Sequence, residues 1–397
     1  MLSKQQLATN NFFLVFLAGL AALAPFSIDA YLPTMVDMAE SLDSNMAAAN
    51  LTISAFMLGM AIGQFFGGPL SDQLGRKTIG LAGLFIFIVS SISIIFASSM
   101  EAVQLLRLAQ AIGGGFASVV CMAQARDVFA PDVIVKKFAN IILVVLIAPM
   151  IAPTIGALLS GFGWRSVFVF LTVYSVFIVA IYLTLVPETN PDRTGRVNLR
   201  AMFRGYGAAI INRTDGRLIA LRYAMFSGFS SGILFCYVTN ATFIFVDHFS
   251  LSKFEFAGAF GLMGLMLMIG NRITAKLLNI YSPPQILNWA NIAQLSMTFG
   301  LVLLCAITEP SLWQITLGLA LLIASSGMIS PAASGYFISL YSKNIGSASS
   351  FNASMMFAFG AVVGGLAAVA SHGNLLPIFI IMFGCTVLAR LILWSAR

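Results

Sequence analysis

Long apolar runs separated by short polar stretches constrain this chain more than any other feature. A helix that crosses the hydrocarbon core of a bilayer needs about 20 apolar residues, and each run is close to that length. Of the 397 residues, 59% are hydrophobic and only 9% are charged, whereas a soluble protein has about 25% charged residues. The sequence therefore predicts an all-α integral membrane protein with twelve transmembrane helices. The expected spans are 11–33, 49–70, 78–99, 102–124, 138–160, 166–186, 218–240, 255–275, 286–307, 312–334, 346–370 and 375–394.

The basic residues predict the orientation of these spans, because cytoplasmic loops carry an excess of Lys and Arg. If the N-terminus is placed inside, only Arg107, Arg165 and Lys253 of the 21 basic residues fall toward the other side. We therefore expect both termini to be cytoplasmic. The first run is too long for the apolar part of a cleaved signal sequence, so we expect it to remain as a span. This topology explains the net charge of +7 without a nucleic-acid partner.

The arrangement of the runs predicts two similar halves. The largest polar stretch, roughly 187–217, has six apolar runs on each side, a pattern typical of transporters built from internal repeats. We expect an N-terminal six-helix bundle at 1–187, a cytoplasmic linker at 188–217 and a C-terminal six-helix bundle at 218–397.

Glycines at four-residue spacing occur in the second and eleventh spans, which hold equivalent places counted inward from the two ends. They are Gly59, Gly63 and Gly67, and Gly360 and Gly364. Such faces let helix backbones approach closely. One interpretation is that the two halves meet at these faces; packing within one half is an equally open alternative.

A carboxylate inside the first apolar run is the strongest candidate for a functional group. Asp29 is the only acid in 11–33, and a charge within a bilayer is costly enough to indicate function. By helical rise, Asp29 and Arg107 both lie roughly 6–9 Å below the outer rim, so they can face each other. Burial raises the pKa of a carboxyl group and a nearby guanidinium lowers it, so such a pair can exchange a proton near neutral pH. A static ion pair is the alternative.

The loop between the second and third spans is the most specific motif. Gly68 and Gly75 allow tight turns, Asp72 can cap the following helix, and Arg76 anchors the cytoplasmic side. The loop resembles the G-x-L-x-D-R-x-G-R-R/K loop of the major facilitator superfamily. Gln73 stands where a basic residue is usual, which weakens any role for that position.

Other stretches agree with this resemblance. Residues 107–113 resemble the R-x-x-Q-G motif of helix 4, and residues 148–156 resemble the antiporter motif of helix 5, with Ala at positions where Gly is typical. Residues 27–33, 124–127 and 164–165 resemble more narrowly the Bcr/CflA group of drug:proton antiporters.

The resemblance implies a major facilitator fold, in which two six-helix bundles surround a central cavity, and it implies residue roles. Asp29 would be the acid that exchanges the proton, and Arg107 would tune this acid. A cytoplasmic charge cluster would close the inner gate in the outward-open state, and a bend in helix 5 would help the motion. The residues implied in gating are Gly68, Asp72, Gly75, Arg76, Asp127, Pro149, Pro153 and Gly156.

The cavity wall is expected to be mostly apolar and adaptable, because flexible Met and aromatic surfaces suit promiscuous binding. For each candidate the alternative is a side chain that faces lipid or another helix. The candidate substrate-binding residues are Tyr31, Met57, Gln110, Phe235, Tyr237, Asn240, Met263 and Asn352.

Several function classes lack their sequence signatures. There is no Gly–Lys dipeptide and therefore no phosphate loop for ATP. The two histidines, His248 and His372, fall in separate predicted loops, and the four cysteines fall inside predicted spans, so no metal site or catalytic cluster is indicated. We expect no enzyme activity and no cofactor, with the proton gradient as the driving force.

These observations and the resemblance predict a proton-coupled antiporter that exports small, mostly apolar drugs by alternating access. Its partners would be a small-molecule drug, protons and the lipid bilayer, and we expect a monomer in a bacterial inner membrane. The resemblance implies amphenicols, bicyclomycin-like compounds and sulfonamides as substrates. The main alternative is a proton-coupled exporter of a native metabolite such as an amino acid or a siderophore. Import is also open, although the helix-5 motif favours antiport, and the sequence supports neither a passive channel nor an embedded enzyme.

Overall fold

The computed structural model describes residues 4–130, 133–191, 193–210, 218–341 and 345–395, and these residues form helices and connecting turns with no strand among them. In the first part of the chain the helices are α1 (Lys4–Thr9), α2 (Asn11–Asp29), η1 (Leu32–Thr34), α3 (Met35–Ser41), α4 (Met46–Leu74), α5 (Arg76–Ile95), α6 (Met100–Val128), α7 (Ile134–Leu159), η2 (Ser160–Phe162) and α8 (Arg165–Thr184). In the second part they are α9 (Leu199–Ile210), α10 (Ile219–Thr242), η3 (Phe243–His248), α11 (Lys253–Leu277), α12 (Pro283–Ile307), α13 (Leu312–Ser339), α14 (Ile345–Ala370) and α15 (Leu376–Ser395).

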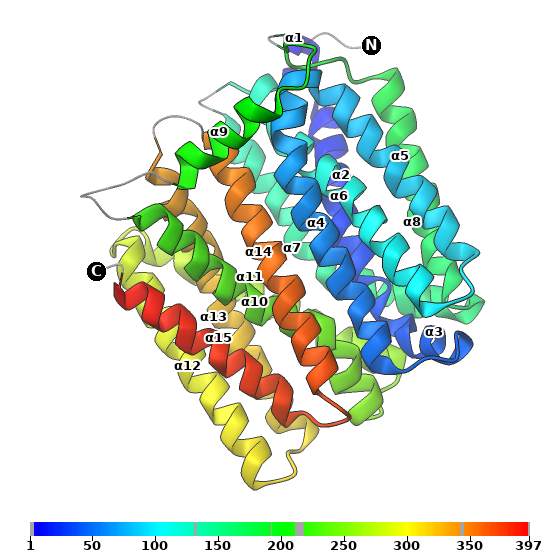
Figure 1. The fold of residues 1–397 in the computed structure, drawn as a ribbon, viewed down its shortest axis with the longest axis vertical. Coiled ribbons are helices and arrows are strands. Elements are labelled where there is room, and N and C mark those ends of the chain that lie inside the picture. Colours follow the sequence, from blue (N-terminus) through cyan, green and yellow to red (C-terminus); the bar gives the residue numbers. More distant parts are fainter. Residues whose placement is uncertain (1–3, 131–132, 192, 211–217, 342–344, 396–397) are drawn as a thin grey trace.

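Twelve helical spans in the described residues are long and apolar enough to cross a membrane, which confirms the predicted number. They form two six-helix bundles that lie side by side (Figure 1). The first bundle contains α2 with α3, and α4 to α8; the second contains α10 to α15. The face where α1 lies and α15 ends is called the terminal face here, and the opposite face, where α3 lies, is called the distal face.

The first span is longer than the sequence indicates. The helical segment does not end at Pro33. After Asp29 the chain forms the 3₁₀ turn η1 and continues as α3, so the span extends to Ser41. Pro33 is tolerated near the start of η1, where its missing N–H costs little. The depth of roughly 6–9 Å for Asp29 assumed that the span ends at Pro33, but roughly 15–20 Å of helix follows Asp29. The depth of Asp29 in the bilayer therefore stays a prediction.

The glycine faces pack within each bundle, so the interpretation that the two halves meet there is wrong. A Cβ atom at Gly59 would lie 2.2 Å from the Leu108 carbonyl oxygen of α6, and a Cβ atom at Gly364 would lie 2.5 Å from the Thr239 hydroxyl of α10. Only glycine allows these backbones to approach so closely. Spacing identifies a close contact but does not say which helix makes it.

The two bundles meet along two helix pairs, α4 with α14 and α7 with α11. On the distal side, polar contacts join the bundles. Lys253 Nζ of α11 lies 2.5 Å from Asp37 Oδ2 of α3, and the Thr242 hydroxyl donates a hydrogen bond of 3.0 Å to the carbonyl oxygen of Leu32. These contacts close the distal side of the molecule.

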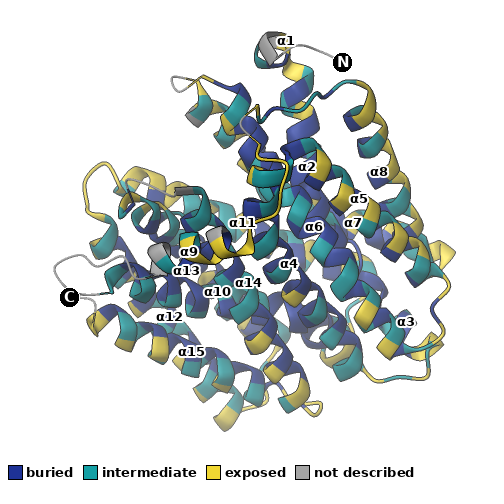
Figure 2. Ribbon diagram, turned by 45° about the horizontal axis from the view of Figure 1, so that its top comes forward, coloured by how far each residue is buried: buried dark blue, intermediate teal, exposed yellow. Residues whose placement is uncertain are grey.

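The predicted linker contains a helix, α9, that crosses the terminal face between the bundles (Figure 1). Met202 and Tyr206 of α9 are buried, whereas Leu199 and Phe203 of the same helix are exposed. Figure 2 shows exposed residues along this helix. The Tyr206 ring stacks on Phe65 of α4 at 4.3 Å between centroids, and its hydroxyl donates to the Phe65 carbonyl. Burial, and secondarily the charge of Asp72, raise the pKa of Tyr206, so this hydroxyl keeps its proton.

The boundaries drawn at 187 and 217 stay a prediction. The sixth span ends at Thr184 and the seventh begins at Ile219, while the last part of the expected linker, 211–217, lies outside the described residues.

Candidate functional site

A cavity of about 230 Å³ lies between the two bundles; it is called the central cavity here. Its wall combines α2 and α7 of the first bundle with α10, α11, α13 and α14 of the second. Both α2 and α7 contain proline at this level, and a proline inside a helix removes a hydrogen bond and bends the backbone. The lining residues are Ala24, Pro25, Ile28, Asp29, Val145, Leu146, Pro149, Leu234, Phe235, Tyr237, Val238, Phe260, Met263, Gly264, Leu267, Ile323 and Phe357.

Among the described residues that line this cavity, Asp29 is the only one with a charged side chain. It is the last residue of α2, it is 5% exposed, and within the described residues it makes no hydrogen bond or ion pair. Tyr237 lies in the same wall, and in the described part of the chain its buried hydroxyl has no hydrogen-bond partner. A buried polar group without a partner carries a free-energy cost that a ligand or a proton can relieve. The cavity therefore offers one acid and one hydroxyl to whatever enters it.

Arg107 does not pair with Asp29, so the prediction that the two side chains face each other is wrong, and so is the alternative of a static ion pair between them. The guanidinium is fully buried, and it donates hydrogen bonds of 3.0 Å to the Ser27 carbonyl oxygen and 2.7 Å to Gln110 Oε1. Its plane also lies over the ring of Phe56 at 4.2 Å. The helical rise predicts a depth in the bilayer for Asp29 and Arg107, but a depth does not determine the direction in which each side chain points.

The predicted substrate-binding residues divide into two groups. Phe235, Tyr237 and Met263 line the central cavity. The other five do not line it, because hydrogen bonds or packing hold them between helices. Those five are Tyr31 (bonded to Thr52), Gln110 (bonded to Arg107 and Ser91), Met57 (next to Thr239), Asn240 (bonded to the Cys236 carbonyl) and Asn352 (next to Ser334).

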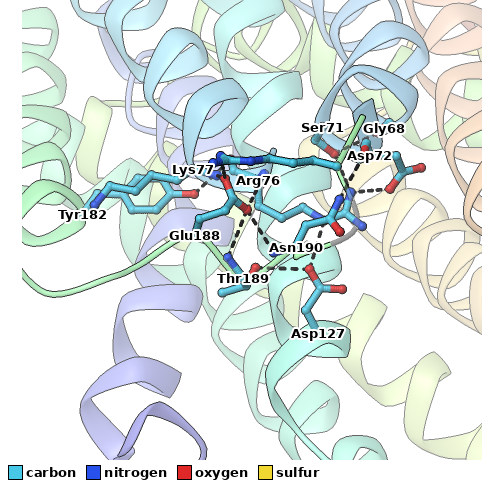
Figure 3. Close-up of polar contacts among 11 residues, drawn as sticks. Gly68, Ser71, Asp72, Arg76, Lys77, Asp127, Tyr182, Glu188, Thr189 and Asn190 are labelled. Atoms are coloured by element: carbon cyan, nitrogen blue, oxygen red, sulfur yellow. Dashed lines mark hydrogen bonds and ion pairs between the residues drawn. The ribbon is translucent and has the colours of Figure 1, made fainter. Parts of the chain in front are cut away.

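The charged side chains around the turn between α4 and α5 form a cluster of polar contacts (Figure 3), and this turn lies on the terminal face (Figure 1). Arg76 lies between two carboxylates: it pairs with Asp72, and its Nε donates 3.0 Å to Asp127 of α6. Its Nη1 also donates 2.8 Å to the Ser71 hydroxyl. The cluster therefore joins α4, α5 and α6 of the first bundle. Gly68 contacts the second bundle instead, since a Cβ atom there would lie 2.5 Å from the Ser350 hydroxyl.

Glu188 completes this cluster, and it was not among the residues predicted from the sequence. Its carboxylate accepts hydrogen bonds of 2.9 and 3.1 Å from the backbone N–H groups of Arg76 and Lys77, the first residues of α5 (Figure 3). It therefore caps a helix whose start lacks intrahelical partners. Gly75 comes just before, with φ +107°, and a Cβ atom there would lie 2.3 Å from Glu188. An acid directly after the sixth apolar run was the available signal.

Gln73 has a structural role, although the sequence predicted little role for this position because a basic residue is usual there. The Asn198 backbone N–H donates 2.5 Å to Gln73 Oε1, and the Gly195 N–H donates 2.9 Å to the Gln73 carbonyl oxygen. These bonds attach the chain that precedes α9 to the end of α4. An uncharged amide, which both donates and accepts, suits this position.

The helix-5 residues lie where α7 meets its neighbours. Pro149 lines the central cavity, Pro153 follows one turn later within α7, and a Cβ atom at Gly156 would lie 1.9 Å from the Ala30 carbonyl oxygen. Glycine at 156 thus lets α7 approach the chain directly after Asp29. Among the described residues no group of His, Cys, Asp and Glu is arranged to hold a metal ion.

Comparisons with known proteins agree with this architecture. The family model described as Major Facilitator Superfamily matches residues 16–394. The "Bicyclomycin resistance protein homolog" of Haemophilus influenzae is 28% identical over 98% of this chain and 96% of its own length. The "Multidrug transporter MdfA" of Yersinia pestis is 29% identical over 66% of this chain and 63% of its own length. The crystal structure of a D-xylose-proton symporter has a TM-score of 0.75 at 13% identity, covering 97% of this chain and 98% of that one, which is a similarity of fold.

Proposed function

Because the chain belongs to the major facilitator superfamily, we propose that it is a proton-coupled antiporter that exports small, mostly apolar drugs. The observation that carries this proposal is the unpartnered carboxyl group of Asp29 in the otherwise apolar cavity between the bundles. An acid at this depth in a membrane protein is costly and is typically part of an ion or substrate pathway. The names of the two curated relatives favour drugs over native metabolites as substrates.

The mechanism is competition for one cavity. A drug enters from the terminal face and packs against Phe235 and Met263, while its polar group reaches Asp29 or the Tyr237 hydroxyl. Asp29 gives up its proton when the drug binds. A proton arriving from the distal side then neutralises the carboxylate and favours release. One proton moved through 100 mV supplies about 2.3 kcal/mol, enough for roughly a 40-fold drug gradient.

Alternating access follows from the rocking of the two bundles. The Asp37–Lys253 pair and the Thr242–Leu32 bond close the distal side in the described arrangement. In the opposite state those contacts separate, and the terminal face closes around the Asp72–Arg76–Asp127 cluster. The bend in α7 allows this motion. The positive-inside pattern supports a cytoplasmic terminal face, and the bacterial sources of the relatives support a bacterial inner membrane. We propose that a monomer works with the proton gradient alone.

A reconstituted transport assay tests the proposed function. The purified protein is placed in proteoliposomes loaded with chloramphenicol, and loss of the drug is followed after a pH gradient is imposed in either direction. We expect loss to accelerate several-fold when the outside is acidic relative to the lumen, because antiport couples outward drug movement to inward proton movement in either orientation of the protein, and to stop when an ionophore collapses the gradient. Acceleration by an acidic lumen would indicate symport and contradict antiport. Equal loss with and without a gradient would contradict coupling. Transport of an amino acid mixture but not of the drug would favour the metabolite exporter.

A further inference from the structure

A second cavity, of about 220 Å³, lies between the bundles nearer the terminal face; it is called the vestibule here. It is formed by α4, α6 and α10 with the first half of α14. Its wall shares Phe235 and Phe357 with the central cavity. These two rings stack at 4.9 Å between centroids with 27° between their planes. The aromatic pair is thus the partition between the two cavities.

The vestibule differs from the central cavity in its chemistry, because its polar groups can donate hydrogen bonds. The hydroxyls of Ser118, Ser349 and Ser350 line it, and within the described residues none of them has a hydrogen-bond partner. A helical serine usually bonds to a carbonyl in the preceding turn, so these hydroxyls are free to bond to a ligand.

Gln64 is the buried polar group of this wall. It is 4% exposed, its Oε1 atom is buried without a partner, and no hydrogen bond of its amide occurs in the described part of the chain. An amide has two donor and two acceptor positions, so a buried amide with no partner is costly. A ligand that entered the vestibule would satisfy it.

Arg126 supplies positive charge at the mouth of the vestibule. Arg76 takes both nearby carboxylates, Asp72 and Asp127, in its own ion pairs, and within the described residues Arg126 has no ion pair. A Cβ atom at Gly346 would lie 3.9 Å from its Nη2 atom, so the guanidinium lies beside the first turn of α14.

We propose that the vestibule is an entry subsite for a hydrogen-bond-accepting or anionic group of the transported drug. The inference rests on the proposed export function and adds a second, donor-lined position to it. Each cavity alone is smaller than a typical drug pocket, but the two together fall within the range of about 300–1,000 Å³. When the rings of Phe235 and Phe357 turn aside, one molecule reaches both cavities: one polar group still reaches Asp29 or the Tyr237 hydroxyl, and a separate acceptor group remains among the donors of the vestibule.

Two probes of different chemistry test the subsite. Chloramphenicol carries nitro and carbonyl acceptors, whereas tetraphenylphosphonium has an apolar body and no acceptor. Binding of each is measured by titration calorimetry on the full chain in phosphatidylcholine nanodiscs. We expect the double variant Gln64→Leu/Ser349→Ala to bind chloramphenicol about 10-fold more weakly, the loss of two hydrogen bonds of ordinary strength, and to bind tetraphenylphosphonium as the wild type does.

The double variant Ser230→Ala/Ser354→Ala is the matched control, since both hydroxyls are buried and unpartnered but line neither cavity. It should bind both probes as the wild type does. Equal weakening of both probes by the Gln64→Leu/Ser349→Ala variant, or no change in either, would overturn the subsite while leaving the export function standing. A wild type that binds neither probe would overturn the proposed function and the subsite together.

A lipid headgroup is another source of an anionic group. The titration with chloramphenicol is therefore repeated in nanodiscs that contain phosphatidylglycerol. A drug subsite predicts the same affinity in both lipids. If phosphatidylglycerol weakens chloramphenicol binding to the wild type but not to the Gln64→Leu/Ser349→Ala variant, a headgroup occupies the vestibule and the assignment to drug is wrong.

Discussion

At the residue scale, the two charged side chains that lie inside apolar runs, Asp29 and Arg107, have different surroundings. Asp29 faces a cavity without a partner, whereas Arg107 is enclosed by aromatic rings and the Ser27 carbonyl. The sequence could identify both, because charges inside apolar runs are rare. It could not show that they point apart, since the direction of each side chain depends on how α2 and α6 pack.

The surroundings of Arg107 predict a structural role. In Arg107→Lys the ammonium cannot reproduce both hydrogen bonds and the planar contact with Phe56, so we expect a loss of about 1–3 kcal/mol of stability. The melting temperature of the purified protein should fall, while the ratio of protons to drug molecules transported stays the same. A changed ratio at an unchanged melting temperature would restore the direct tuning role that the family resemblance implied.

At the element scale, the spans were predictable and the segments between them were not. Hydropathy located all twelve spans because a bilayer demands about 20 apolar residues. Helix α9 was missed because its apolar residues alternate with Arg200 and Arg204, which indicated a solvated linker. The cap on α5 was missed because Glu188 is 111 residues away in sequence from Lys77.

That cap predicts an effect on turnover. In Glu188→Gln the side chain loses its charge and one acceptor oxygen, so the start of α5 and the charge cluster are held less firmly. We expect chloramphenicol transport to slow several-fold with little change in binding affinity, and trypsin to cut the chain between α8 and α9 faster. Glu309→Gln, at an exposed acid between α12 and α13, is the control. Unchanged turnover and cleavage would show that the cap is dispensable.

At the scale of the whole molecule, the major facilitator fold was accessible from motifs, and the family match confirms it. The position of the central cavity was not accessible, because it depends on which faces of α2, α7, α10 and α11 meet. Five of the eight expected lining residues turned out to lie between helices for the same reason. The coupling of drug to proton is also a property of the whole, since the cavity wall combines one acid from the first bundle with aromatic residues from the second.

Proton release on drug binding tests the central claim most directly. Chloramphenicol is added to the purified protein in weakly buffered solution with a pH indicator, at a series of pH values. If Asp29 exchanges its proton for the drug, the wild type and the control Asp43→Asn, at an exposed turn, should release up to about one proton per molecule bound. Asp29→Asn should remain folded and release none. Proton release from Asp29→Asn equal to that of the wild type would contradict the account.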